Sequence, residues 1–102
     1  MESFRLRFDW DRAKARANLA KHGVGFVLAS SVLLEPLATT IFDEEHSRDE
    51  ERWITIGVPT NGLHLVVSHT WQPTGPNSAM ARIISARRAK RPEILEYQEN
   101  QE

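Results

Sequence analysis

The dipeptide Asn61-Gly62 is the feature that most restricts how this chain can fold. Residues 53–58 precede it and residues 63–71 follow it, and both runs are rich in β-branched and aromatic side chains. An Asn-Gly pair suits the left-handed backbone of a tight hairpin turn. No Asp, Glu, Lys or Arg occurs anywhere in residues 53–81. We therefore predict an antiparallel β-hairpin at the centre of the fold.

A strand and a helix are predicted before this hairpin. Apolar and basic residues alternate over residues 4–8, which indicates a half-buried strand. Residues 12–21 contain no glycine, proline or β-branched residue, so a helix is expected there, with Asp9 or Asp11 as its cap and Gly23 at its end. Three small side chains share one side of this helix and are expected to face the sheet: Ala13, Ala17 and Ala20.

The remaining elements complete an α+β pattern. A second helix is expected over residues 26–34, and a closing helix over residues 93–99. Residues 38–42 and 81–87 are further strand candidates, whereas the proline-rich residues 72–78 predict a loop. The order β-α-α-β-β-β-β-α predicts one α+β domain spanning the whole chain, with a mainly antiparallel sheet covered by helices on one face.

Composition narrows the cellular setting. The chain has no cysteine, which excludes disulfides and thiolate metal sites. Its first residues lack the pattern of a secretory signal, and no apolar run approaches the roughly 20 residues that a membrane span needs. Histidines and carboxylates do not occur at metal-ligand spacing. We expect a cytoplasmic protein with no cofactor, no metal and no membrane association.

Charged side chains are unevenly distributed, although the net charge is only −1. Residues 43–52 carry six acidic and two basic side chains, and we expect residues 43–51 to point away from any RNA because they would repel phosphate. A basic cluster without acidic residues follows later in the chain: Arg82, Arg87, Arg88, Lys90 and Arg91. Such a cluster in a near-neutral protein indicates a local anion site, and the alternative is a solvated face.

Three segments carry a family resemblance. They are Phe8-Asp9-Trp10-Asp11 with Lys14-Ala15, Asn18, Lys21-His22-Gly23-Val24 and Phe26; Asp43-Glu44-Glu45-His46-Ser47 with Glu50-Glu51-Arg52-Trp53-Ile54-Thr55-Ile56-Gly57; and Arg82-Ile83-Ile84-Ser85-Ala86-Arg87-Arg88-Ala89 with Glu93 and Tyr97. In this order they resemble the BrnT family of toxins, from which only the longer loop 72–79 departs. The resemblance implies a RelE-like fold and a ribonuclease toxin that needs no metal. It also implies a ribbon-helix-helix antitoxin of the BrnA type as partner. The toxin would associate with operator DNA only through this antitoxin.

Cleavage of RNA without a metal requires a base, an acid and cations around the phosphate. Arginine suits the last role because its planar fork binds phosphate oxygens bidentately. On a regular strand, Arg82 would share a face with Arg88 and oppose Arg87. All three are catalytic candidates, and we favour Arg87 and Arg88, which can converge at the strand's end. The alternative for either is an ion pair with Glu51 or Glu93.

Two further catalytic candidates are His22 and Tyr97. His22 lies at a helix C-terminus, which favours imidazolium and hence a general acid; alternatively it only binds the last helical carbonyls. Tyr97 resembles a tyrosine that related toxins place near their arginines, and alternatively it packs the closing helix on the sheet. Three residues are expected to bind substrate: Lys21, His46 and Arg52.

The other histidines and Lys21 each have a simpler interpretation beside the functional one. His46 lies among carboxylates that favour its charged form, and alternatively it orders Asp43 in a turn. His69 is expected to be a hydrogen-bonded core residue, and His64 has the opposite parity on the same strand. Lys21 either contacts phosphate or is simply solvated.

The favoured function is a metal-independent endoribonuclease toxin that inhibits growth until an antitoxin neutralises it. Its substrate would be RNA, either free or presented by the ribosome. The competing function is a catalytically inactive homologue that serves only as an antitoxin-binding and transcriptional autoregulation subunit. An RNA-binding module is a third class, for which stacking aromatics and a basic groove are poorly represented.

Overall fold

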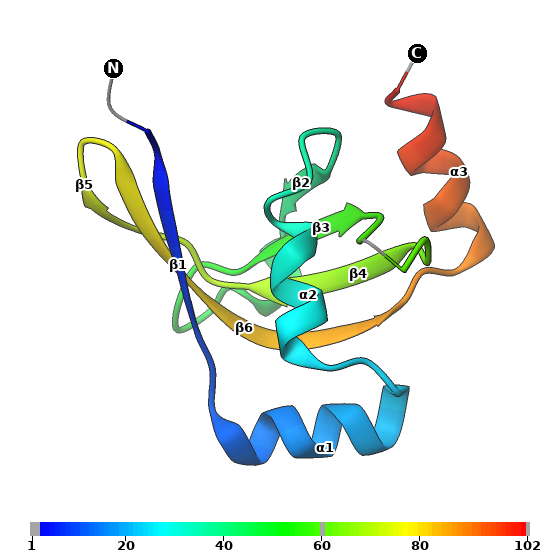
Figure 1. Ribbon diagram of the computed structural model, residues 1–102, viewed down its shortest axis with the longest axis horizontal. Helices are drawn as coiled ribbons and strands as arrows, with labels where there is room; N and C mark the ends of the chain where they lie inside the picture. Colours follow the sequence, from blue (N-terminus) through cyan, green and yellow to red (C-terminus); the bar gives the residue numbers. More distant parts are fainter. Residues whose placement is uncertain (1–2, 60, 102) are drawn as a thin grey trace.

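The computed structural model describes residues 3–59 and 61–101. In these residues, three α-helices and six strands form a mixed α+β fold (Figure 1). The helices are α1 (Arg12–His22), α2 (Phe26–Val32) and α3 (Arg91–Glu99), with a 3-10 turn at Glu44–His46. The strands are β1 (Arg5–Asp9), β2 (Thr39–Phe42), β3 (Trp53–Gly57), β4 (Leu65–His69), β5 (Gln72–Gly75) and β6 (Ser78–Arg88). No helix in these two ranges is long and apolar enough to cross a membrane.

The strands form one sheet in the order β1-β6-β4-β3-β2, and β5 pairs with the first part of β6. Every pairing is antiparallel except that of β1 with β6, so the expected mainly antiparallel sheet and its central hairpin are confirmed. The prediction of a loop over residues 72–78 is wrong, because Gln72–Gly75 forms the additional strand β5. Pro73 is compatible with a strand there because β5 pairs on one side only, where a missing N–H is tolerated.

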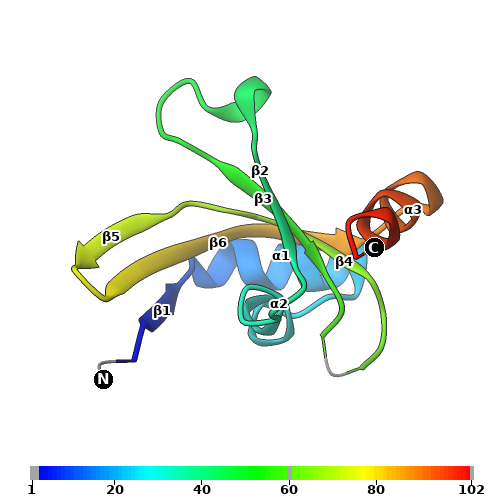
Figure 2. The same ribbon diagram turned by 90° about the horizontal axis from the view of Figure 1, so that it is seen from above.

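The sheet buries apolar side chains on both faces. Leu65 and Val67 of β4 pack with α2 in the main core, whereas Val66 between them packs with Ile56 and Tyr97 of α3. Since successive side chains of a strand point to opposite faces, α2 and α3 lie on opposite sides of the sheet. Figure 2 shows α1 and α2 together beneath the sheet and α3 at its far end. The prediction of helices on one face is therefore wrong for α3, because β3 and β4 are apolar on both faces.

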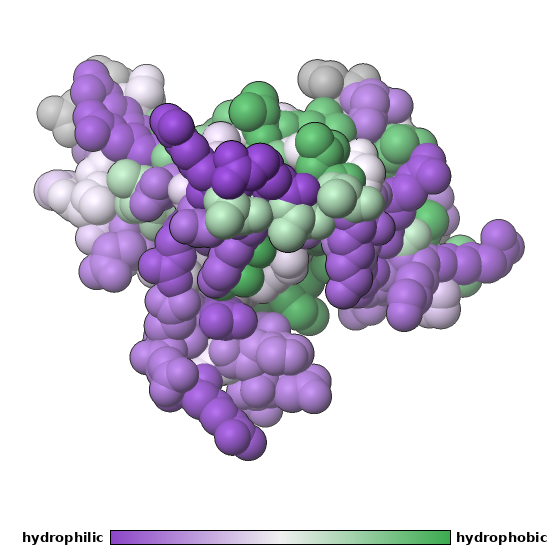
Figure 3. All heavy atoms as spheres, turned by 90° about the horizontal axis from the view of Figure 1, so that it is seen from below, coloured by the Kyte–Doolittle hydropathy of each residue, from purple (hydrophilic) through white to green (hydrophobic). Residues whose placement is uncertain are grey.

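Helix α1 meets the sheet through an amide side chain. The prediction that its alanines face the sheet is wrong, because all three are exposed: Ala13, Ala17 and Ala20. Buried Asn18 instead donates to the carbonyls of Ala86 and Val24 at 2.9 and 3.0 Å, and accepts from the Ala86 N–H at 3.1 Å. β1 pairs with β6 only as far as Arg82, so Asn18 takes the place of a neighbouring strand beyond it. The outer side of α1 mixes hydrophilic side chains with alanines (Figure 3).

A β-bulge reverses the direction of side chains along β6. His69 of β4 faces Ile83, where a regular register would place Ile84 opposite it. One extra residue inverts the alternation beyond it. Ile83 and Ala86, three positions apart, consequently both belong to the core on the α2 side.

The bulge also redirects the arginines of β6. Arg82 precedes it and Arg87 follows it, so both point to the face opposite α2, while Arg88 points to the α2 side. The expectation that Arg82 shares a face with Arg88 and opposes Arg87 is wrong, because it assumed a regular strand. The strand runs through Arg88, so Arg87 and Arg88 diverge instead of converging at its end.

Candidate functional site

Two arginines and one glutamate meet on the sheet face opposite α2. Arg82 Nη2 donates to Glu50 Oε1, and Arg52 Nη2 lies 3.9 Å from the same oxygen. Arg82 comes from β6, whereas Glu50 and Arg52 come from the connection between β2 and β3. Within the described ranges, the Nε of Arg52 is buried and has no hydrogen-bond partner. Each guanidinium carries five N–H donors and both side chains are partly exposed, so the cluster has other N–H donors to spare for a phosphate.

His46 lies beside this cluster and is oriented by Asp43. Its Nδ1 is 2.9 Å from Asp43 Oδ2. An ionised carboxylate only accepts, so Nδ1 carries the hydrogen and Nε2 is free to exchange a proton. The Asp43 side chain is nearly buried, whereas that of His46 is 60% exposed. His46 can therefore order Asp43 in a turn, as the alternative interpretation has it, and still present an accessible imidazole.

His46 shares a surface hollow with part of this cluster. His46, Glu50 and Arg52 line a depression of about 310 Å³, and Glu50 also lines the neighbouring one together with Arg82. Residues 43–51 are expected to point away from RNA, yet Glu50 of this segment pairs with Arg82, a candidate phosphate-binding residue. Its carboxylate offsets part of the positive charge and fixes the spacing of the two arginines.

Arg87 has different contacts at the other end of β6. Its Nη1 and Nη2 donate to the two carboxylate oxygens of Glu93, each at 2.8 Å. Glu93 also accepts from the Lys90 N–H at 2.7 Å, in the first turn of α3. The bond to Arg87 lowers the pKa of Glu93 and raises that of Arg87. This is the ion pair with Glu93 that the sequence offered as the alternative, and it ties α3 to the sheet.

Tyr97 is buried beneath α3. Its hydroxyl donates to the carboxylate of Glu35, at 3.1 Å from either oxygen, and its ring packs edge-on against His64. Burial, and then the Glu35 hydrogen bond and charge, raise the pKa of Tyr97. Glu35 also accepts from the Val58 N–H at 3.0 Å. These contacts agree with the alternative role of packing α3, and the catalytic role of Tyr97 stays a prediction.

His22, Lys21 and Arg88 lie at the opposite end of the sheet from Arg82. Asn18, one helical turn before His22, binds Ala86, which precedes Arg88 by two residues. Arg88 points to the side of α1, so these three residues share one corner of the molecule. The structure does not bring them to Arg82, Arg52 or His46. Their catalytic and substrate-binding roles stay predictions.

The family is now decided by comparison with known proteins. A family model described as "Ribonuclease toxin, BrnT, of type II toxin-antitoxin system" matches residues 10–93. The chain belongs to the BrnT family. The crystal structure of the ribonuclease toxin BrnT from Brucella abortus is similar, with a TM-score of 0.59 and 25% identity over 84% of this chain and 99% of that one. Comparison with curated proteins found no match.

This result confirms the resemblance and gives the chain its general function. It is a BrnT ribonuclease toxin of a type II toxin–antitoxin system, and such a toxin has an antitoxin as partner. The matched residues include the complete cluster around Glu50: Asp43, His46, Glu50, Arg52 and Arg82.

Two members of this candidate site are not singled out as functional by the sequence. Asp43 has a detectable signal, because an acidic residue three positions before a histidine can orient its ring. Glu50 has none, since its partner Arg82 is 32 positions away and their contact depends on how the β2–β3 connection folds over β6.

Proposed function

We propose that this BrnT toxin is a metal-independent endoribonuclease that cleaves RNA through its 2′-hydroxyl, with His46 as general base and Arg52 and Arg82 as phosphate-binding residues. The observation that carries the proposal is the shared hollow. The accessible imidazole of His46, oriented by Asp43, lines one hollow with Arg52 and Glu50, and Glu50 pairs with Arg82 in the neighbouring hollow. A base and a phosphate-binding pair are what this chemistry requires.

In the proposed step, His46 Nε2 removes the proton of the 2′-hydroxyl, and the 2′-oxygen attacks the adjacent phosphorus. The bond from phosphorus to the 5′-oxygen breaks, and that oxygen takes a proton from water. The products are a 2′,3′-cyclic phosphate and a 5′-hydroxyl. Arg52 and Arg82 stabilise the charge that accumulates on the phosphate oxygens in the transition state. Asp43 stabilises the imidazolium that forms on His46.

The finer family properties belong to the same proposal. They are a RelE-like fold, inhibition of growth in the cytoplasm, and neutralisation by a ribbon-helix-helix antitoxin of the BrnA type that carries the complex to operator DNA. Large apolar side chains are exposed around α2, with Val27 at 72% and Leu34 and Leu37 at 60% each. Such exposure supports a state in which a partner covers part of the surface.

The test uses the purified chain and a short labelled RNA in the presence of a strong chelator. We expect fragments with cyclic phosphate ends, identified by mass spectrometry, and no cleavage where the 2′-hydroxyl is replaced by hydrogen. His46→Ala should slow cleavage by about a hundredfold or more. His64→Gln is the matched control, because His64 packs on Tyr97 and lies outside the hollow.

Several results would reject the proposal. Cleavage that stops in chelator and returns with one divalent ion would show a metal mechanism. A folded chain that binds the antitoxin but never cleaves RNA would favour the inactive regulatory subunit. Loss of cleavage in His22→Gln with normal activity in His46→Ala would move the proton-transfer site to the C-terminus of α1.

A further inference from the structure

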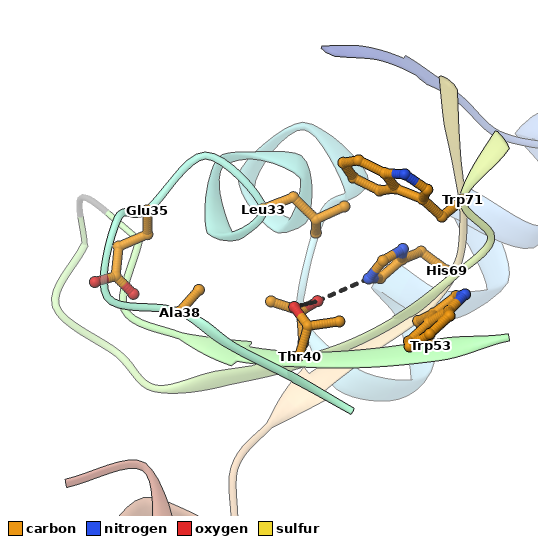
Figure 4. Close-up of a pocket in the computed structure, with 8 residues that line it drawn as sticks. Leu33, Glu35, Ala38, Thr40, Trp53, His69 and Trp71 are labelled. Atoms are coloured by element: carbon orange, nitrogen blue, oxygen red, sulfur yellow. Dashed lines mark hydrogen bonds between the residues drawn. The ribbon is translucent and has the colours of Figure 1, made fainter. Parts of the chain in front are cut away.

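A pocket of about 360 Å³ adjoins the proposed phosphate site and has two tryptophans in its wall (Figure 4). Trp53 belongs to β3, and Trp71 follows β4. Trp71 also lines the hollow that contains Arg82, so the two hollows meet at this residue. The pocket lies on the α2 side of the sheet, with His69, whereas the Arg82 side chain points to the other side. An RNA strand that passes Trp71 can therefore reach both hollows.

Each indole is held by a phenylalanine. Phe4 stacks parallel to Trp71, with ring centroids 6.1 Å apart, and Phe42 packs edge-on against Trp53 at 5.1 Å. Trp71 nevertheless stays 39% exposed. Aromatic surfaces that are already positioned bind a flat ring at a low entropic cost. The wall of the pocket is thus prepared for stacking.

A hydrogen-bond chain forms the floor of the pocket. The hydroxyls of Thr40 and Thr55 are 2.8 Å apart, and Thr55 Oγ1 is 2.7 Å from His69 Nε2. His69 Nδ1 donates to the carbonyl of Thr70 at 2.9 Å, because a carbonyl only accepts. Burial lowers the pKa of His69, which keeps the ring neutral and makes Nε2 an acceptor. These contacts confirm His69 as a hydrogen-bonded core residue.

The hydrogen bonds from Thr40 through Thr55 to His69 can run in only one direction. Since His69 Nε2 accepts from Thr55, the Thr55 oxygen accepts from Thr40. The Thr40 hydroxyl has then used its hydrogen and offers a ligand only lone pairs. The Glu35 carboxylate also lines the pocket, and it too accepts hydrogen bonds without donating any. Thr40 and Glu35 therefore favour a ligand that donates hydrogen bonds.

We propose that this pocket binds an unpaired RNA base with an exocyclic amino group, from the same RNA strand that is cleaved. This inference rests on the proposed RNA cleavage at Arg52 and Arg82. Adenine, cytosine and guanine carry an amino donor, whereas uracil presents carbonyl acceptors in its place. Single-stranded RNA is commonly recognised by bases stacked on aromatic side chains. The pocket would give this ribonuclease a base preference near the cleavage position.

The test measures binding separately from cleavage. Adenosine, cytidine, guanosine and uridine monophosphates, and short 2′-O-methyl RNAs with each base at one position, are titrated by calorimetry and by tryptophan fluorescence. Trp10→Phe provides the fluorescent background, because Trp10 packs on Phe26 away from the pocket. We expect quenching by the three amino-bearing bases and at least fivefold weaker binding of uridine. Trp71→Leu should weaken binding about tenfold.

Two more variants keep the test decisive. Trp71→Phe retains a stacking ring and should restore most of the binding, which excludes simple misfolding of Trp71→Leu. Thr40→Val should reduce the preference against uridine. Equal binding of all four bases, or no binding while RNA is still cleaved, would overturn the pocket alone. Selective binding without any cleavage would overturn the proposed ribonuclease mechanism and leave the pocket in place.

Discussion

The two ends of β6 each carry an arginine–glutamate pair on the same face of the sheet, yet the pairs differ in what they leave unused. Arg82 and Glu50 are both partly exposed, and Glu50 is shared with Arg52, whose Nε has no partner in the described part of the chain. Arg87 directs two N–H donors at the two oxygens of Glu93, and Glu93 also binds the first turn of α3.

This difference separates a binding site from a structural contact. At the Arg87 end, the glutamate uses its oxygens to fix a helix, so the pair has little capacity left for a ligand. At the Arg82 end, two guanidinium groups share one carboxylate and keep donors for a phosphate. Arg82 and Arg87 are the same residue type, and both belong to the basic cluster. The number of donors that remain after internal pairing is what differs.

The largest expected effect is a loss of RNA cleavage when the Arg82 end is changed. Arg82→Ala should lower kcat/KM for RNA cleavage by about a hundredfold or more, because it removes a charge-assisted contact to the transition state. The free energy of unfolding should change by less than about 1 kcal/mol, as is usual for an exposed ion pair. Steady-state kinetics and urea denaturation measure the two quantities, with Arg16→Ala on exposed α1 as the control. Normal cleavage in Arg82→Ala would remove it from the site.

A smaller effect is expected at the Arg87 end, and on stability instead of rate. Arg87→Ala should lower the free energy of unfolding by about 1–2 kcal/mol, because it removes both bonds that hold Glu93 and loosens α3. Arg88→Ala is the matched control, since Arg88 is the next residue on β6 and points to the other side. The folded fraction of Arg87→Ala should cleave RNA almost normally. Lost cleavage in a fully stable Arg87→Ala protein would instead support its predicted catalytic role.

The smallest effect is a difference in pH dependence between the two ends. His69 pairs with Ile83, the residue after Arg82, and burial lowers the pKa of folded His69 below 6.5, so its contribution to stability is complete above pH 6.5 and declines as the pH falls below it. The folded pKa of Glu93 lies below 4.5, so its contribution is complete above pH 4.5 and is lost as the pH falls through that lowered value. Denaturation of wild type and Glu93→Gln across pH should show a stability gap that closes only below pH 4.5. A gap that closes already near pH 6 would contradict the assignment to Glu93.

Much of this fold and part of the site are predictable from local sequence. The left-handed Gly62 between β3 and β4, the Asp11 cap that accepts from the Lys14 N–H, and the left-handed Gly23 that ends α1 all depend on neighbouring residues. The structure places His46 and Arg52 in one hollow, and their expected substrate-binding roles stay predictions. Turns and helix caps can be predicted in this way because their contacts involve only a few consecutive residues.

Sequence by itself determined the α+β class, the strand–helix order apart from β5, the BrnT family and a histidine confined to the core. Tertiary structure alone decided where the arginines point, since one bulge at Ile84 reverses half of β6. It also decided that Glu50 pairs with Arg82 and Glu93 with Arg87. The physical reason is that strand register and ion pairing depend on residues far apart in the chain, whereas turns and helix caps depend on neighbours.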